Sequence, residues 1–432
     1  MVYDPNIAIL ILIGGLLLLI FLRVPIVFSV GISTTLCLIY MGFGPAALIQ
    51  HTIRGMSSFA MMAIPFFITM GALLSAGGVG KRLINLAGAM VGWMRGSLMQ
   101  INIASSVVFS GISGSAAADV ASVGSVVMPQ MIAAGYKKDI TGAISMSSAI
   151  MAVTKPPSHN MVIYATAAGG VSIGSLFLAG YIPTFLMCFA LMIAAHIISI
   201  RGKYPKGDKF SLKRLIVEFG RSLFALTVIV IVVVGVIAGI FTATESAAIA
   251  VIYSLLISIH VYKGLKWREV WGVLGKAVNM LSMIMILIGV SAAFGFALTF
   301  LQVPQLLALW VSGMTDNPIL ILLMINLFLL FLGSIMDMAP LILITTPILL
   351  PMAVGAGMSP ITFGVVMILN CGIGLITPPV GTVLFISSSV AKESSERLIK
   401  ANLPFYACLI AVLLLITFVP ALTTWLPSVF GT

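Results

Sequence analysis

Charged residues are scarce in this chain of 432 residues: they make up 8% of it, and only 11 are acidic. Soluble domains carry about 25% charged residues, so the composition excludes an ordinary soluble protein. Histidine and cysteine are also rare, with four of each, and they are scattered without an HExxH pattern or paired cysteine spacing. The sequence therefore predicts neither a transition-metal site nor a disulfide framework.

Sequence motifs for nucleotide binding and catalysis are missing as well. The sequence has no phosphate-binding loop, so ATP is not expected to be the direct energy source, and no paired nucleophile and base that would indicate an enzyme. The net charge of +11 comes from basic residues in short loops between apolar segments. That distribution is typical of the positive-inside rule of membrane proteins, rather than of nucleic-acid binding.

Long hydrophobic segments dominate instead, since 61% of the residues are hydrophobic. Many runs reach the roughly 20 residues that span a bilayer. The first run, Ile7 to Leu22, lacks a basic leading region and a small-residue cleavage site, so we do not interpret it as a cleaved signal peptide. The sequence predicts an all-α polytopic membrane protein with about ten transmembrane helices.

Two Pro-Pro pairs interrupt apolar segments at corresponding positions 222 residues apart. A Pro-Pro pair removes two backbone donors and stops a regular helix, and irregular backbone at membrane depth is tolerated only inside protein or beside a cavity. Six Gly and Pro pairs share this ungapped register: Gly111 and Gly333, Pro129 and Pro351, Gly135 and Gly357, Gly142 and Gly364, Pro156 and Pro378, Pro157 and Pro379. We infer an internal duplication centred on two broken helices, which is the best sequence indicator of a transporter binding site.

The duplication divides the chain into two repeats and a linker. Residues 1–200 form the first repeat, with a re-entrant hairpin at about 97–135 and a broken helix at about 140–168. Residues 201–221 form a basic cytoplasmic linker, and residues 222–432 form the second repeat, with a hairpin at about 317–356 and a broken helix at about 361–390. The first hairpin is expected to begin with a short helix of about 12 residues, Leu98 to Phe109, too short to span a bilayer.

The basic loops set the orientation. With the linker placed inside the cell, nearly all other basic loops also fall inside if each hairpin enters and leaves on one face. The two hairpins then open from opposite faces, and both termini lie outside. The sequence therefore predicts an inverted-repeat, ion-transporter-like fold in a bacterial inner membrane.

Each repeat offers a Gly- and Ser-rich hairpin tip and a helix break. Helix C-terminal ends and backbone carbonyls suit hard alkali cations, so we predict sodium as the only metal. Tight helix packing is the alternative use of these small residues. The predicted sodium-binding residues are Ser110, Gly111, Ser113, Ser115, Ala152, Lys155 and Ser158 in the first repeat and Gly333, Asp337, Gly374, Thr377 and Val380 in the second. The predicted substrate-binding residues are Lys155, Ser158, His159, Asn160 and Thr377.

Lys155 is the most unusual of these residues, because a charge at the bilayer centre costs several kcal/mol. Two interpretations stay open: it binds a carboxylate of the substrate, or it pairs structurally with Asp119, Asp337 or Glu245. His159, with Asn160 after it, either contacts substrate or is a satisfied polar residue of the break.

The acidic residues also carry alternatives. Asp119 is expected to cap a half-helix, with an ion-ligand role as the alternative. Asp337, in a hairpin tip, is expected to be a ligand or a gating residue. Glu245, after Thr242 and Thr244, is expected to form an N-terminal capping pair rather than to serve transport.

Four stretches together resemble a known family. They are Ser110–Asp119 (SGISGSAAAD), Gly239–Ala248 (GIFTATESAA), Asp337–Pro351 (DMAPLILITTPILLP) and Gly372–Gly381 (GIGLITPPVG). They resemble the large membrane subunit of tripartite ATP-independent periplasmic (TRAP) transporters, over nearly the whole chain. One position departs from the family pattern: Lys155 stands where an apolar residue usually precedes Pro-Pro-Ser.

The resemblance implies a sodium-driven elevator carrier of a small organic anion, such as sialic acid, another sugar acid or a C4-dicarboxylate. It also implies two partners, a small four-helix membrane subunit and a periplasmic substrate-binding protein. The alternatives are a stand-alone sodium-coupled anion carrier without a binding protein, and a channel, which two opposed hairpins suit less well than alternating access.

Overall fold

The computed structural model describes residues 3–22, 24–57, 59–313 and 315–430, and every regular element in those ranges is a helix. Within these ranges, seven helices are long and apolar enough to cross a membrane, or eight if one bent pair counts as a single span. This confirms the all-α polytopic class. The predicted number of about ten spans stays a prediction, because several apolar helices, such as Ile26–Tyr40, are shorter than 18 residues.

The chain begins with a set of short helices that end in an amphipathic arm. They are α1 (Pro5–Ile9), η1 (Leu10–Gly14), α2 (Gly15–Phe21), α3 (Ile26–Tyr40), α4 (Pro45–Met56), η2 (Phe59–Met62), α5 (Ala63–Ala76) and α6 (Val79–Val91). The chain bends by 75° between α5 and α6. Gly78 makes this bend in the left-handed backbone region (φ 73°), which glycine adopts without steric cost.

The helices of the two hairpins and broken helices recur in one register. The first set is α7 (Ser97–Ser113), α8 (Ala116–Asp119), η3 (Val120–Gly124), α9 (Ser125–Ala133), α10 (Lys138–Ala149), α11 (Met151–Thr154) and α12 (His159–Ala167). The second set is α18 (Pro318–Ile335), α19 (Met338–Gly355), α20 (Pro360–Leu375) and α21 (Thr382–Ala391). A shift of 222 residues carries the span 116–133 onto α19 at both ends.

One expectation about the first hairpin is wrong. Its leading helix is α7, with 17 residues, rather than a helix of about 12 from Leu98 to Phe109. Gly96 (φ 70°) and Gly114 (φ 59°) bracket it in the left-handed region, so the helix continues through Ser110–Ser113 until the second glycine. Residues 110–113 of the predicted hairpin tip are therefore the last turn of a helix.

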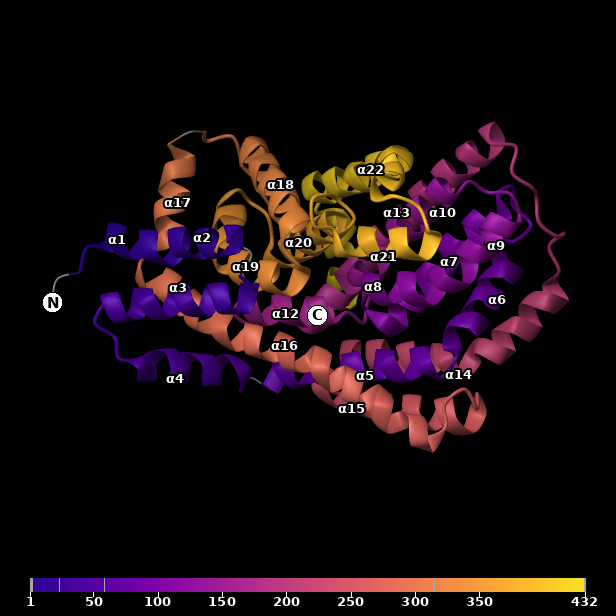
Figure 1. Ribbon diagram of the computed structural model, residues 1–432, viewed down its shortest axis with the longest axis horizontal. Coiled ribbons are helices and arrows are strands. Elements are labelled where there is room, and N and C mark those ends of the chain that lie inside the picture. The colour runs from indigo at the N-terminus through magenta and orange to yellow at the C-terminus, as the bar shows by residue number, and fades with distance from the viewer. Residues whose placement is uncertain (1–2, 23, 58, 314, 431–432) are drawn as a thin grey trace.

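The remaining helices connect the hairpins and complete the bundle. They are α13 (Ile173–Arg201), α14 (Leu212–Ile237), α15 (Ala243–Leu256), η4 (Ile257–Val261), α16 (Trp267–Phe300), α17 (Val303–Ser312), α22 (Ser395–Phe418) and α23 (Ala421–Phe430). In Figure 1, α4, α5, α14 and α15 form the lower edge, α18 and α22 lie along the upper edge, and α8, α12, α20 and α21 lie between them. The long α16 packs on α3, α4, α5 and α19.

The linker between α13 and α14 is shorter than residues 201–221. Ser211 caps α14, with its hydroxyl accepting from the Arg214 N–H at 3.3 Å, so residues 212–221 are already helical. The non-helical part folds back on the first repeat, where Tyr204 stacks on Tyr136 at 4.2 Å between ring centroids. The Gly96 N–H also donates to the Pro205 carbonyl at 3.0 Å.

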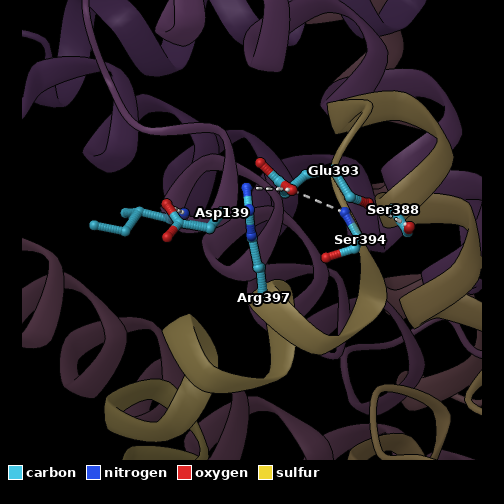
Figure 2. Close-up of polar contacts among 6 residues, drawn as sticks. Asp139, Ser388, Glu393, Ser394 and Arg397 are labelled. Carbon is cyan, nitrogen blue, oxygen red and sulfur yellow. Dashed lines mark hydrogen bonds and ion pairs between the residues drawn. The ribbon is translucent and has the colours of Figure 1, made fainter.

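The two sets of helices are joined through α10, which packs on α21 and α22. The Ser147 hydroxyl donates to the Asn402 side-chain oxygen at 2.7 Å, and the Ser387 hydroxyl donates to the Gly142 carbonyl at 2.8 Å. Figure 2 shows the adjoining end of α22, where Arg397 pairs with Glu393 at 3.3 Å and Asp139 of α10 lies next to them in this view. Both breaks therefore belong to one packed body.

Candidate transport site

The first hairpin tip touches the first helix break. Ser115 caps α8 by accepting from the Ala118 N–H at 3.3 Å, and Gly114 turns the chain just before it. A Cβ added to Gly114 would lie 3.3 Å from both the Pro157 carbonyl and His159 Nδ1. Only glycine gives this close approach without displacing the break.

Lys155 is buried at this contact, with 8% of its surface exposed. Its Nζ donates to the Val107 carbonyl of α7 at 2.6 Å, and the Ser110 hydroxyl donates to the same carbonyl at 2.6 Å. The described residues form no ion pair that involves Lys155, so the structural pairing with Asp119, Asp337 or Glu245 is not observed. A helix carbonyl is the observed partner of this cation.

Four other predicted residues of the first repeat lie around the same contact. The Ser158 hydroxyl donates to the Val153 carbonyl at 2.8 Å, so it closes the break against its own chain. Ser113 and Ser115 contact each other at 3.5 Å through hydroxyl and backbone. Ala152 is fully buried in α11.

Gly111 and Asn160 lie at the edge of the contact. A Cβ on Gly111 would come within 2.8 Å of Ile229 on α14, so this glycine allows α14 to approach the hairpin rather than the break. Asn160 is buried in the first turn of α12.

The second repeat brings its predicted residues together more closely. Gly333 and Gly374 are in backbone contact, since a Cβ on Gly374 would meet the Gly333 main chain. The Val380 N–H donates to the Ser334 carbonyl at 3.0 Å, and the Thr377 hydroxyl donates to the Ile373 carbonyl at 2.8 Å. The C-terminal ends of α18 and α20 therefore meet, and their last carbonyls carry the partial negative charge of helix ends.

Asp337 lies at the N-cap position of α19, one turn beyond Gly333, and is exposed. Tyr406 of α22 donates its hydroxyl to the Ile376 carbonyl at the break. Thr184 of α13 occupies the position that corresponds to Tyr406, and it contacts the Thr154 hydroxyl at 3.4 Å. Sequence reasoning missed both hydroxyls, although the 222-residue register pairs them.

Asp119 does not cap its helix, contrary to the favoured expectation, because Ser115 does. Asp119 is buried with 1% of its surface exposed, and its Oδ1 accepts from the Ser106 hydroxyl at 2.7 Å. Its Oδ2 has no hydrogen-bond partner among the described residues. Ser106 also contacts Ser148 at 3.2 Å, and Asn102 donates to Ser148 at 3.2 Å, which gives a buried polar network.

The corresponding network of the second repeat contains amides and no carboxylate. Asn370 occupies the position that corresponds to Ser148, and its side-chain N–H donates to the Asn326 side-chain oxygen at 2.7 Å. Polar residues within apolar helices were the available sequence signal for both networks.

Glu245 has a purely local role. Its carboxylate accepts from the Thr242 N–H at 2.8 Å, and the Thr242 hydroxyl accepts from the Glu245 N–H at 3.2 Å. This reciprocal pair is a capping box, which confirms the capping interpretation.

A cavity of about 400 Å³ lies between the first hairpin and the helices α5 and α16. Its polar lining is Ser75, Ser113, Ser115, Ser122, His159 and Lys276. Ser75 of α5 and Ser122 of η3 are hydrogen-bonded at 2.8 Å across it. Lys276 of α16 was missed in the sequence because it resembled the other basic residues near the ends of spans.

The same helical architecture occurs in solved structures of other proteins. The chain is similar to the Alcanivorax borkumensis YdaH transporter, with a TM-score of 0.57 and 15% identity, covering 84% of this chain and 88% of that one. It is also similar to Neisseria gonorrhoeae MtrF, with a TM-score of 0.54 and 15% identity over 86% of this chain and 83% of that one. At this identity the likeness establishes the fold alone.

The sequence places the chain within one family of such proteins. Residues 13–422 match the family described as "Tripartite ATP-independent periplasmic transporter, DctM component", and the chain belongs to it. The resemblance that the four motifs carried is thereby confirmed.

Curated relatives agree with this assignment. The C4-dicarboxylate TRAP transporter large permease protein DctM of Pseudomonas aeruginosa is 36% identical over 86% of this chain and 87% of its own length. The sialic acid TRAP transporter large permease protein SiaM of Vibrio cholerae is 35% identical over 96% and 97%. The isethionate TRAP transporter permease protein DctMQ of Oleidesulfovibrio alaskensis is 37% identical over 95% of this chain and 65% of its own length.

Proposed function

We propose that this chain is the large membrane subunit of a sodium-coupled tripartite importer of a small organic anion in the bacterial inner membrane. The single observation that carries the proposal is the cavity between the first hairpin and α16, because it combines one cation, four hydroxyls and an imidazole. Ligand pockets have this composition, with an apolar lining and a few convergent polar groups. The relatives named for C4-dicarboxylate, sialic acid and isethionate are named for organic anions, which supports the same substrate class.

In this proposal Lys276 attracts the carboxylate or sulfonate, and Ser113, Ser115 and His159 orient it. Lys276 is exposed in the cavity and forms no ion pair with the described residues, so it is available to an arriving anion. The other predicted substrate residues belong to the breaks and are not part of the cavity lining: Lys155, Ser158, Asn160 and Thr377. A cavity of about 400 Å³ suits a small organic acid.

The residues of the second repeat fit a sodium ion. Gly333, Gly374, Thr377 and Val380 surround two meeting helix ends, where carbonyl and hydroxyl oxygens are abundant, and the Asp337 carboxylate follows one turn later. Hard cations prefer oxygen ligands of this kind. Sodium that moves inward down its gradient would drive uptake, and these residues would hold the bound ion in place.

The mobile part would consist of the hairpins and broken helices, moving as an elevator against the other helices. Small residues at the contact support this division. A Cβ on Gly71 of α5 would lie 3.4 Å from the Ile112 carbonyl and from Ser113, so bare backbone faces the first hairpin there. Flat contacts without interlocked side chains permit sliding.

Two partners are part of the proposal, a small membrane subunit and a periplasmic substrate-binding protein. The isethionate relative DctMQ supports the first, since it is a fusion of which this chain spans 65%. The alternative is a carrier that works without a binding protein.

The test is uptake into proteoliposomes that contain this chain and its small membrane subunit. Labelled organic acids are offered with the cognate binding protein, under an inward sodium gradient or under choline. We expect uptake that requires sodium and the binding protein together. Uptake with sodium alone would favour the stand-alone carrier, and equal uptake in choline would contradict sodium coupling.

A further inference from the structure

Lys155 and Thr377 occupy the same position in the two repeats, 222 residues apart, each directly before a Pro-Pro pair. Their side chains differ in charge and in the hydrogen-bond partner that each one reaches. The Thr377 hydroxyl donates to the Ile373 carbonyl of its own helix at 2.8 Å. The Lys155 ammonium reaches α7 and donates to the Val107 carbonyl at 2.6 Å.

The surroundings of the Lys155 ammonium are those of a cation site. It lies directly after the C-terminal end of α11, which carries partial negative charge, and against the Val107 carbonyl in the C-terminal half of α7. Ser110, one of the residues predicted to bind sodium, shares the Val107 carbonyl with it. An ammonium that is 8% exposed needs such oxygens, because water no longer solvates it.

The first repeat therefore does not fit a sodium ion as the second repeat does. A sodium ion beside the Lys155 ammonium would meet a like charge in a poorly solvated place, and the repulsion there is strong. Building on the proposed sodium coupling, we infer that the Lys155 ammonium is a permanent cation that replaces a sodium ion in the first repeat. Sodium then binds only in the second repeat.

The buried Asp119 carboxyl group lies against the same helix as the Lys155 ammonium. It contacts Ser106, the residue next to Val107 in α7, so one helix lies against both buried groups although they form no ion pair.

The test measures sodium binding without transport. Sodium that binds the folded state raises the melting temperature of the purified chain in detergent, relative to equal choline chloride. Four forms are compared: the wild type, Thr377→Ala, Lys155→Thr and the double variant. Lys155→Thr installs the residue that the second repeat carries, so it is the matched change.

We expect Thr377→Ala to raise the sodium concentration that gives half of the maximal melting-temperature shift at least about 10-fold above the wild-type value, because sodium has no second site to use. We expect Lys155→Thr to add a sodium response that persists in the double variant. A full sodium response in Thr377→Ala would overturn the inference, and this measurement leaves Lys155 untouched. A folded double variant without any sodium response would overturn it too.

Failure of the proposed function is separable from failure of this inference. If the wild type shows no sodium response, the proposed sodium coupling fails. Lys155→Thr alone then decides the inference: a gained sodium response supports it, and the same melting temperature in sodium and choline refutes it.

Discussion

The two helix breaks share a backbone and differ in their chemistry. Residues 151–160 around the first break are all buried, and an ammonium holds the break to α7. At the second break Pro378, Pro379 and Val380 are exposed, and the contact between hairpin and helix is made by the backbones of Gly333 and Gly374. Helix ends and prolines therefore recur at both breaks, while the groups that stabilise each break differ, so the role of one break does not predict the role of the other.

The largest effect is expected from disrupting the backbone contact between Gly333 and Gly374 at the second break. Gly374→Ala would place a Cβ against the Gly333 main chain and force α18 and α20 apart, at a cost of about 1–3 kcal/mol. We expect uptake to be abolished and the melting temperature to fall.

Gly355→Ala is the matched control for that change. A Cβ at Gly355 would meet nothing within 4 Å, so we expect wild-type uptake. Normal uptake by Gly374→Ala would show that the two helix ends need not touch.

Removing one hydroxyl sharpens the comparison without disturbing the backbone. Thr377→Ala should raise the sodium concentration for half-maximal uptake about 10-fold, since a contact to a charged group contributes about 1.5 kcal/mol. Thr377→Ser keeps the hydroxyl and should restore the wild-type value. An unchanged sodium dependence in the alanine variant would place the ion elsewhere.

Lys276 belongs to neither break, so it tests whether the cavity recognises the anion independently of both. Lys276→Met should raise the KM for the anion about 5-fold, the value for roughly 1 kcal/mol of a partly solvated charge contact, with the sodium dependence unchanged. Lys400→Met removes an exposed cation from α22, outside the cavity lining, and serves as the control. Equal KM values for both variants would exclude Lys276 from the site.

The smallest effect comes from the two hydroxyls at corresponding positions of α22 and α13. Tyr406→Phe removes the hydrogen bond to the Ile376 carbonyl and should cost about 1 kcal/mol of stability, seen as a lower melting temperature. Thr184→Val should cost less than this hydrogen bond, because the Thr184 hydroxyl mainly bonds the Gly180 carbonyl of its own helix at 2.8 Å. A larger loss for Thr184→Val would reverse the comparison.

Glycine and proline made the architecture readable from the sequence. They dictate local backbone geometry, so the interruptions at Pro156 and Pro378 and the register of the repeats followed from their spacing. The capping pair of Thr242 and Glu245 could also be predicted from the sequence, because both partners lie within one turn.

Contacts between residues far apart in the chain could not be predicted from the sequence. The partner of Lys155 is a carbonyl 48 residues away, and a carbonyl is present at every position, so no residue type marks it. Asp119 was expected to act on its own helix end, but its partner Ser106 lies across the hairpin, where only the packed structure brings the two together. The cavity is likewise a property of α5, α16 and the hairpin as they pack.

The linker that joins α13 to α14 bears on how far the two ends of these helices can separate. Residues 202–211 are not helical, and Tyr204 holds them folded against Tyr136. Fully extended, ten residues span at most about 33–36 Å, more than the thickness of the hydrocarbon core. The segment is thus long enough for the ends of α13 and α14 to separate by more than the thickness of that core. Its contacts with the first repeat, which are the ring stack on Tyr136 and the hydrogen bond from the Gly96 N–H to the Pro205 carbonyl, are what hold it close, rather than chain length.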